Sequence, residues 1–364
     1  MKVKDISKYL EEIAPLSYQE SYDNSGLLIG DFDAEVSGIL ISLDVTEAVI
    51  KEAISKGFNL IVAHHPLIFK GVKSITGKHW VERCIQLAIK NDISIYAIHT
   101  NLDNINTGVN EQICNTLGLK DIEILVPKSG TLMKLTTFVP SENKSELLAA
   151  LHQAGAGNIG NYDYCSFSTE GEGAFRPNEN SNPTIGEKSA HTAVKEIRIE
   201  VLVQKPQLNK VLTALVKSHP YEEVAYYVSE LQNNNQEVGS GMIGNLKNAV
   251  TPDNFLKFLK QKMNAQGIKY TNICFDEITR VAVCGGAGSF LLKDAIKRGA
   301  QIFISSDFKY HDYFEADNKI IIADIGHYES EQFTKELLYG ILSEKFANIA
   351  IRLTEVVTNP INYL

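Results

Sequence analysis

The sequence lacks the long apolar runs of membrane proteins and the paired cysteines of secreted ones. None of its 364 residues belongs to an apolar run near the ~20 residues that span a bilayer, and Met1-Lys2-Val3-Lys4-Asp5 lacks the apolar core of a signal peptide. The 5 cysteines are odd in number, scattered and in no CxxC pair. This pattern predicts reduced, mostly buried thiols rather than a disulfide framework or a zinc knuckle. We therefore expect a cytoplasmic protein.

An excess of positive charge is also absent. The formal net charge is -9 and the isoelectric point is near 5.6, which argues against broad attraction to nucleic acid or to an anionic membrane. Apolar residues make up 44% of the chain and charged residues 22%, as in globular proteins. The length predicts two or three domains. We expect a small-molecule ligand and no membrane partner, while a local basic patch would still allow contact with nucleic acid.

Two adjacent histidines end a short apolar run in the first part of the chain. The run Phe58-Asn59-Leu60-Ile61-Val62 leads into Ala63-His64-His65-Pro66, which is typical of a buried strand that stops at a proline. In open α/β sheets, ligands collect at the carboxyl ends of strands. Histidine is also the commonest metal ligand among side chains. The two imidazoles therefore mark a candidate site.

The segments around this strand predict a parallel α/β unit. A strand over 37–44 and a helix over 46–56 precede it, which completes a βαβ unit with two parallel strands. A helix over 80–90 and a strand over 93–98 follow, and that strand ends in His99-Thr100-Asn101-Leu102-Asp103-Asn104. A third strand thus brings polar groups to the same edge.

The two ends of the chain repeat one pattern. Residues 51–61 match residues 293–303, and each copy is a helix closed by a glycine and followed by a strand. In the second copy a strand over 280–284 comes before, Ser305-Ser306-Asp307 takes the place of Ala63-His64-His65, and a strand over 319–324 ends in Gly326-His327. We expect two related α/β halves with largely parallel sheets, built from residues 1–128 and 236–364.

The middle of the chain breaks this pattern. We expect strands over 132–139, 161–168, 195–203 and 224–231, and helices over 141–154 and 207–217. Their βαββαβ order is that of a ferredoxin-like α+β module, here inserted as residues 129–235. Residues 169–193, rich in Gly, Asn, Ser and Glu, are predicted to be a long mobile loop.

Five side chains at strand ends form a metal-ligating set. His327 and Glu331 are four residues apart, so a helix starting there presents both on one face. With His64, His65 and Asp103 they supply three imidazoles and two carboxylates. One tetrahedral ion needs fewer ligands, whereas two metal ions sharing a bridging carboxylate need such a set.

Each of these residues also has a structural interpretation. His64 and His65 can cap a strand end, Asp103 can stabilise a loop, and Glu331 can be a first-turn acid favoured by the helix dipole. His99 is either a further ligand or a residue that orients one. The glycine-rich segment 284–289 is either a tight strand-to-helix turn or a phosphate cradle, although it lacks the P-loop lysine.

With these motifs in order along the whole chain, the sequence resembles the Nif-three-like proteins, which are catalogued as GTP cyclohydrolase I type 2 homologues. The resemblance rests on residues 22–27, 42–46, 63–66, 99–103, 284–288 and 326–331. It implies a dinuclear metal centre with ligands at His64, His65, Asp103, His327 and Glu331, in which Glu331 is the bridge. It also implies a toroidal homohexamer. Segment 305–311 departs from the family pattern, with serine where many members have Thr-Gly before the acid.

The inserted module resembles the P-II signalling and CutA-like fold of the longer family members. His219-Pro220-Tyr221-Glu222-Glu223 is its most telling stretch.

Two functions fit these features. The first is a metal-dependent hydrolase of a phosphoester, nucleotide or related small molecule, in which Asp307 or His311 is the proton shuttle or an orienting residue. The second is a non-catalytic metal-binding scaffold whose insert senses a small molecule. Imidazole and carboxylate ligands without thiolate suit two divalent ions chosen from zinc, iron, manganese, cobalt and nickel.

Overall fold

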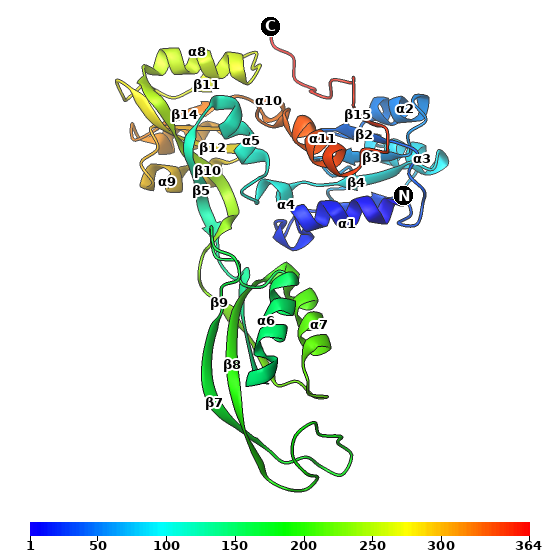
Figure 1. Cartoon of the computed structure of the whole chain (residues 1–364). Coiled ribbons are helices and arrows are strands. Elements are labelled where there is room, and N and C mark those ends of the chain that lie inside the picture. The colour runs from blue at the N-terminus through cyan, green and yellow to red at the C-terminus, as the bar shows by residue number, and fades with distance from the viewer. The chain divides into compact units, whose positions relative to one another are not determined.

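The computed structural model describes all 364 residues and divides into two compact units. Residues Met1–Val126 and Glu237–Leu364 form one unit, here called the core unit. Residues Pro127–Gln236 form the other, here called the insert unit (Figure 1). No helix in the chain combines the length and the apolar character that crossing a membrane requires.

The first sheet of the core unit has five strands. Their spatial order is β1 (Gly26–Ile29), β4 (Ser94–Ala97), β3 (Leu60–Ala63), β2 (Ile39–Ser42) and β15 (Ile351–Leu353). Strand β1 is antiparallel to β4, and all other neighbours are parallel. The parallel pairing of β2 with β3 confirms the predicted βαβ unit. Strand β15 comes from the other end of the chain, and the sequence pattern did not predict it.

The second sheet of the core unit has six strands. Their spatial order is β11 (Lys269–Tyr270), β14 (Ile321–Asp324), β13 (Ile302–Ser306), β12 (Ile278–Ala287), β10 (Asn235–Val250) and β5 (Lys120–Lys128). Strands β12, β13 and β14 are parallel, whereas β11 runs antiparallel to β14 and β10 runs antiparallel to β12. The expected α/β fold is therefore confirmed, with a mixed second sheet.

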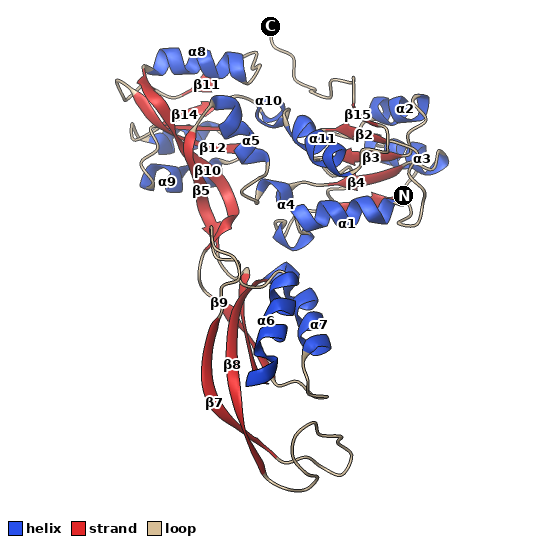
Figure 2. Cartoon of the chain, in the orientation of Figure 1, coloured by secondary structure: helices blue, strands red, loops and turns tan.

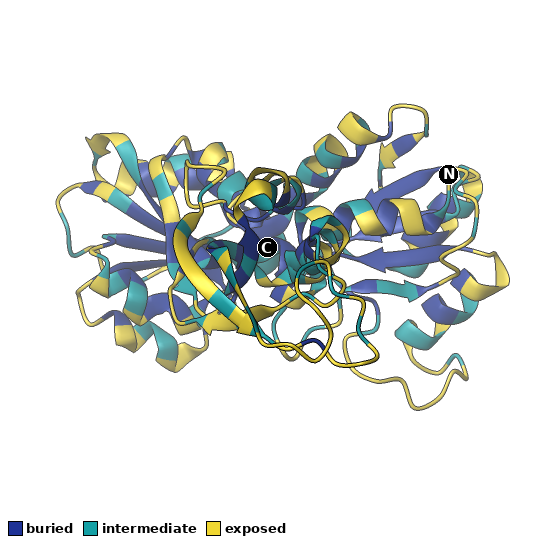
Figure 3. Ribbon diagram, turned by 60° about the horizontal axis from the view of Figure 1, so that its bottom comes forward, coloured by how far each residue is buried: buried dark blue, intermediate teal, exposed yellow.

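Helices pack on the sheets because the strands are apolar on both faces (Figure 2). The core-unit helices are α1 (Val3–Ile13), α2 (Glu47–Ser55), α3 (Trp80–Lys90), α4 (Thr100–Asp103), α5 (Val109–Leu117), α8 (Pro252–Lys262), α9 (Leu292–Lys297), α10 (His327–Glu331) and α11 (Thr334–Lys345). In β3, Leu60 and Val62 face a core shared by both sheets, while Ile61 faces α2 and α3. Figure 3 shows the strands as the buried layer of the unit.

The shared core fixes the two sheets of the core unit against each other. It contains side chains of α1, α5, α8 and α11 together with alternate residues of both sheets. Each fully buried Ile or Leu contributes about 1.5–3 kcal/mol relative to exposure. The repeated helices α2 and α9 are followed by Gly57 and Gly299 at φ of 68° and 75°, which confirms the predicted glycine ends.

The insert unit has the predicted ferredoxin-like order. Its antiparallel sheet runs β7 (Phe167–Phe175), β8 (Thr192–Gln204), β6 (Leu132–Pro140) and β9 (Tyr226–Leu231), and its helices are α6 (Lys144–Gln153) and α7 (Leu208–Ser218). The buried residues of both helices join those of β6 and β8 in one core.

Short 3-10 helices occur in both units. They are η1 (Leu16–Tyr18), η4 (Ser289–Leu291) and η5 (Tyr310–Ala316) in the core unit, and η2 (Ser141–Asn143) and η3 (Lys205–Gln207) in the insert unit.

Two predictions for the insert unit were wrong. The strand expected over 161–168 is β7, which begins only at Phe167. The loop expected over 169–193 is shorter, because β7 continues to Phe175 and β8 begins at Thr192. Gly171 and Gly173 suggested a loop, but β7 is an edge strand that pairs with β8 along its whole length. A strand with one partner tolerates glycines that contribute nothing to packing.

Candidate metal centre

The predicted ligands lie at the carboxyl ends of strands from both sheets. His64 and His65 directly follow β3, and β4 leads through His99 into α4, whose last residue is Asp103. In the second sheet β14 is followed by α10, which begins at His327 and ends at Glu331. Asp103 therefore lies in a helical turn, and the loop interpretation was wrong.

Two groups of ligating side chains face the two oxygens of Glu331. Oε2 lies 2.9 Å from Nε2 of His65 and 3.1 Å from Nε2 of His327. Oε1 lies 3.8 Å from Nε2 of His64, which is itself 3.6 Å from Oδ1 of Asp103. Within each group the ligating atoms lie within 4.8 Å of one another. All five predicted ligands are thus brought together, with one carboxylate between two groups.

The cluster contains polar atoms that the protein itself does not satisfy. Nε2 of His64 and Oδ1 of Asp103 are buried and have no hydrogen-bond partner. His64 is fully buried, and its Nδ1 donates to the carbonyl oxygen of Ile98 at 2.8 Å. This bond leaves a lone pair on Nε2, which faces a carboxylate oxygen rather than a donor. Buried lone pairs without donors are costly, and a cation would satisfy them. The donor set therefore fits a divalent metal ion.

The other three imidazoles are held by carboxylates. Nδ1 of His65 lies 2.8 Å from Asp44, Nδ1 of His99 lies 2.7 Å from Asp23, and Nδ1 of His327 lies 2.6 Å from Asp307. A carboxylate on Nδ1 fixes the ring and its tautomer and leaves Nε2 as the ligating atom.

Carboxylates and imidazoles compensate one another's charges in this cluster. Burial and the nearby charge of Glu331 raise the pKa of Asp103 above its usual range. Burial opposes protonation of His65, yet its hydrogen bonds to Asp44 and Glu331 raise its pKa to about 10. Burial likewise opposes protonation of His327, but the charge of Glu331 and the bond to Asp307 raise its pKa to about 11. Divalent cations bind to such sites in place of these protons.

His99 joins the cluster through a third group. Its ligating atoms and those of His64 and His65 lie within 4.8 Å of one another. Its backbone amide donates to Asn101 at 2.9 Å, and Asp23 also accepts from the amide of Thr100 at 3.0 Å. The structure therefore places His99 where either expected role, ligand or orienting residue, is open to it.

Glycines make room for the Glu331 carboxylate. A Cβ on Gly286 would lie 2.4 Å from Oε1 of Glu331, and Gly286 has a φ of 63°. The amides of Gly285 and Gly286 donate to Asn110 and Ser330, both at 2.9 Å. These two amides are therefore not available to a phosphate, which weighs against the phosphate-cradle interpretation. The alternative of a tight turn was also incomplete, because β12 continues to Ala287.

The two expected proton shuttles have different positions. Asp307, which directly follows β13, holds His327 and has a φ of 58°, a left-handed conformation that is uncommon for a residue with a side chain. His311 is exposed in η5, where its ring contacts Tyr310 and Phe314. The structure thus brings Asp307 to the cluster but shows no contact between His311 and its ligands.

Sequence reasoning missed Asp23 and Asp44 as orienting residues. Asp44 lies two residues beyond β2, beside the strand that carries His65, and an acid at a neighbouring strand end was a usable signal. Asp23 lies in Asp23-Asn24-Ser25-Gly26, whose residue types indicate only a turn. Its contact with His99 spans 76 residues of sequence, so no local pattern predicts it.

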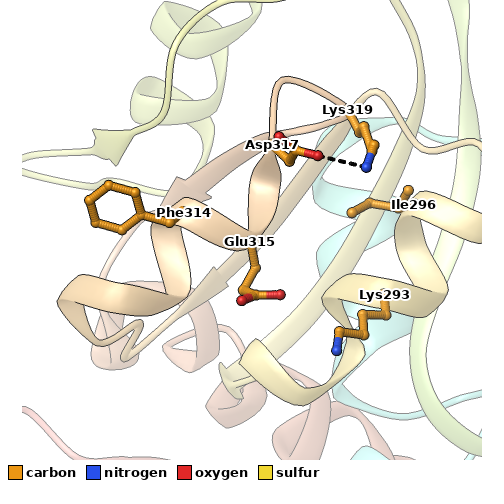
Figure 4. Close-up of a pocket in the computed structure, with 6 residues that line it drawn as sticks. All are labelled: Lys293, Ile296, Phe314, Glu315, Asp317 and Lys319. Carbon is orange, nitrogen blue, oxygen red and sulfur yellow. Dashed lines mark hydrogen bonds and ion pairs between the residues drawn. The ribbon is translucent and has the colours of Figure 1, made fainter.

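A separate cavity lies between α9 and η5, outside this cluster. It has a volume of about 450 Å³ and is lined by Lys293, Ile296, Phe314, Glu315, Asp317 and Lys319. Figure 4 shows the ion pair between Asp317 and Lys319, whose atoms are 2.6 Å apart. Both side chains are more than half exposed, and none of the lining residues belongs to a ligating group. The buried cluster is therefore the better candidate for chemistry.

Comparisons with known proteins identify the relatives of this chain. A GTP cyclohydrolase 1 type 2 homolog from Halalkalibacterium halodurans is 39% identical over 364 residues, which cover 99% of this chain and 98% of the relative. A Bacillus cereus protein related to NIF3 has a solved structure with a TM-score of 0.89 and 36% identity, covering 100% of this chain and 99% of the other. A Staphylococcus aureus protein of known structure has a TM-score of 0.79 and 32% identity, with coverage of 100% and 99%.

A family model matches nearly the whole sequence. The model described as Duf34/NIF3 (NGG1p interacting factor 3) matches residues 1–360. The match includes both halves of the core unit, the insert unit and every ligand of the cluster. The chain therefore belongs to the Duf34/NIF3 family.

Proposed function

We propose that this protein is a metal-dependent hydrolase that binds two divalent ions and acts on a phosphoester, nucleotide or related small molecule. The position of Glu331 carries the proposal, because its two oxygens face two different ligating groups. His65, His327 and Oε2 of Glu331 would hold one ion. His64, Asp103 and Oε1 of Glu331 would hold the other. Two such ions supply Lewis acidity toward a phosphoryl or carbonyl oxygen and make water a better nucleophile at neutral pH.

The protein's own residues prepare this site in two ways. Asp44 and Asp307 hold the rings of His65 and His327, so the ligating atoms are in place before an ion arrives. His99 and Asp307 are the side chains best placed to accept or return a proton, since each lies at the edge of the cluster. Asp307 is half exposed, which gives it an exchange route to solvent.

The test of this proposal combines metal content with turnover. The parent chain, purified without chelator, should contain two equivalents of metal by elemental analysis, which also identifies the ion among zinc, iron, manganese, cobalt and nickel. Glu331→Gln keeps the shape of the side chain and removes its charge, so both ions should be lost together. Asp103→Asn should mainly lose one ion. Hydrolysis of p-nitrophenyl phosphate should rise with metal occupancy in the parent chain.

Two results would overturn this proposal. Full metal content in a folded Glu331→Gln variant would remove Glu331 from the centre. A parent chain with two ions and no turnover of generic phosphoesters would reject the hydrolase and leave a metal-binding protein.

A scaffold with a sensory insert is the second candidate, and a cavity in the insert unit favours it. The cavity has a volume of about 980 Å³, and Arg176, Arg198, Tyr221 and Tyr227 are among its lining residues. The amide N–H of Asn182 donates to Glu222 at 2.7 Å, which ties the loop before β8 to segment 219–223. Tight binding of a small molecule to the insert unit without turnover at the centre would support this alternative over the hydrolase.

A further inference from the structure

Two exposed aromatic rings lie beside the metal centre. Tyr22 is 62% exposed and Phe69 is 43% exposed. Their ring centroids are 6.2 Å apart, and the ring of Phe69 meets that of His99 edge-on at 6.1 Å. His99 in turn belongs to a ligating group. The two rings thus form an aromatic surface, here called the Tyr22–Phe69 platform, that begins at the cluster and faces solvent.

The same short segment fixes both rings relative to His99. Asp23 follows Tyr22 directly and lies 2.7 Å from Nδ1 of His99. Nδ2 of Asn24 donates to the carbonyl oxygen of Ile68 at 2.5 Å, next to Phe69. Asp23 thus ties the backbone next to Tyr22 to the cluster, and Asn24 ties the same segment to the backbone next to Phe69. An ordered apolar surface at a polar centre is typical of a ligand site.

The segment that carries Phe69 is positively charged in an acidic protein. Residues 67–79 contain Lys70, Lys73 and Lys78 and no acidic residue, whereas the whole chain has a net charge of -9. All three lysines are exposed, and the segment has no helix or strand. Lys70 directly follows Phe69, whereas farther along the segment the carboxylate of Glu82 accepts from the backbone amides of Thr76 and Lys78. The exposed Lys70 next to the platform favours the approach of an anion.

We propose that the Tyr22–Phe69 platform binds an aromatic ring of the substrate while the anionic group of that substrate lies at the cluster. The substrate class is then an aryl or heteroaromatic phosphate ester rather than an alkyl one. This inference rests on the proposed function. Stacking of one ring on aromatic side chains commonly changes affinity by a factor of about 10 or more, so the preference should be measurable.

The test compares two phosphonates that share a headgroup and cannot be hydrolysed as esters. Calorimetric titration of the metal-loaded chain should show that phenylphosphonate binds about 10-fold more tightly than methylphosphonate. Tyr22→Leu and Phe69→Leu should each reduce this ratio, and the double variant should bring it near 1 while methylphosphonate affinity stays constant. Phe32→Leu is the matched control, because Phe32 is 49% exposed and lies beyond the opposite end of β1.

Each outcome decides between the inference and the proposed function. Equal binding of both phosphonates, with phosphoester turnover intact, would overturn the platform and leave the hydrolase. A phenyl preference without turnover of any phosphoester would support the platform and reject the hydrolase. Binding of neither phosphonate would overturn the platform, while phosphoester turnover would decide the hydrolase separately. Loss of the phenyl preference in Phe32→Leu would overturn the platform. A parent chain without any phenyl preference, together with a changed sedimentation coefficient in the double variant, would also overturn it, because the rings would then serve contact between copies of the chain.

Discussion

A residue without a side chain controls the shape of this centre. Gly286 lies against Oε1 of Glu331, the oxygen that faces His64 and Asp103. A methyl group there would displace the carboxylate, since an approach of 2.4 Å is far shorter than a van der Waals contact. The lack of a side chain at Gly286 therefore leaves the space that the Glu331 carboxylate occupies.

Gly286→Ala should abolish metal binding in the group formed by His64, Asp103 and Glu331. Gly299→Ala is the control, because Gly299 has a similar φ of 75° but a Cβ added to it would meet no atom within 4 Å. Each variant should lower the free energy of unfolding by about 1–2 kcal/mol through its left-handed backbone conformation. Elemental analysis should show metal loss in Gly286→Ala alone. Equal metal content in both variants would mean that the carboxylate adjusts freely.

The five predicted ligands come together in the structure, whereas only Asp307 among their orienting acids was expected from the sequence. His64, His65, His327 and Glu331 follow apolar strands, so local periodicity placed them at one kind of sheet edge. The role of Asp23 depends on which imidazole lies opposite, which only the packing of distant segments decides. Local signals therefore identify ligating residues better than the residues that orient them.

At the scale of elements, the segment after β15 connects both halves of the core unit. Oγ1 of Thr358 donates to Asp44 at 2.5 Å, and Asp44 holds His65. The next residue, Asn359, donates to Glu329 of α10 at 3.0 Å. This segment has no helix or strand, yet it supports the ligands of one group from both sides.

Thr358→Val should weaken metal binding at the group that contains His65 by up to about 10-fold. Loss of a residue that orients a metal ligand typically lowers metal affinity by about 10–100-fold, and Thr358 acts on His65 only through Asp44. Thr354→Val is the matched control, because Oγ1 of Thr354 also donates to a carboxylate, that of Glu52, away from the cluster. The control should lower the free energy of unfolding by about 1 kcal/mol and leave metal affinity unchanged. Competition titration with a chromogenic chelator measures the affinities. Equal affinities in the two variants would exclude a supporting role for Thr358.

Elements with strong periodicity were predicted better than edge strands. The helix Trp80–Lys90 has the predicted bounds, because its apolar spacing is regular and Lys90 is followed by Asn91 and Asp92. Strand β7 was predicted too early in the chain, at 161–168, because few of its residues are buried and its sequence contains Gly171 and Gly173. Strand β15 has three residues, and its pairing with β2 depends on the whole core unit. Edge strands owe their formation to partners rather than to their own residues.

At the scale of the whole molecule, the insert unit interrupts the core unit between two neighbouring strands. Strand β5 precedes the insert unit and strand β10 follows it, and the two strands lie side by side in the second sheet. Ends that are already neighbours can be joined by a short turn, which makes the insertion separable on topological grounds.

Removal of residues 130–234, with a short Gly/Ser linker in their place, should leave the metal content unchanged. All five ligands and their orienting acids belong to the core unit, so the deletion removes none of them. Elemental analysis and circular dichroism of the shortened chain beside the parent are the measurements. A shortened chain that keeps its secondary structure and loses its metal would show that the insert contributes to the centre. Sedimentation of the same pair tests whether the expected hexamer depends on the insert.

The sequence distance within the cluster has a consequence for when the protein could bind a metal ion. His65 and Glu331 lie 266 residues apart, and the support from Thr358 to Asp44 spans 314 residues. Chains fold from their N-terminal end during synthesis, and contacts between distant residues form late. Nearly the entire polypeptide must therefore be synthesised before the two groups that contain Glu331 can be completed, whereas the group of His64, His65 and His99 lies within the first 99 residues. A metal ion held by Glu331 would therefore bind only after synthesis of nearly the whole chain, and a chain that ends before Glu331 would lack a ligand of both groups.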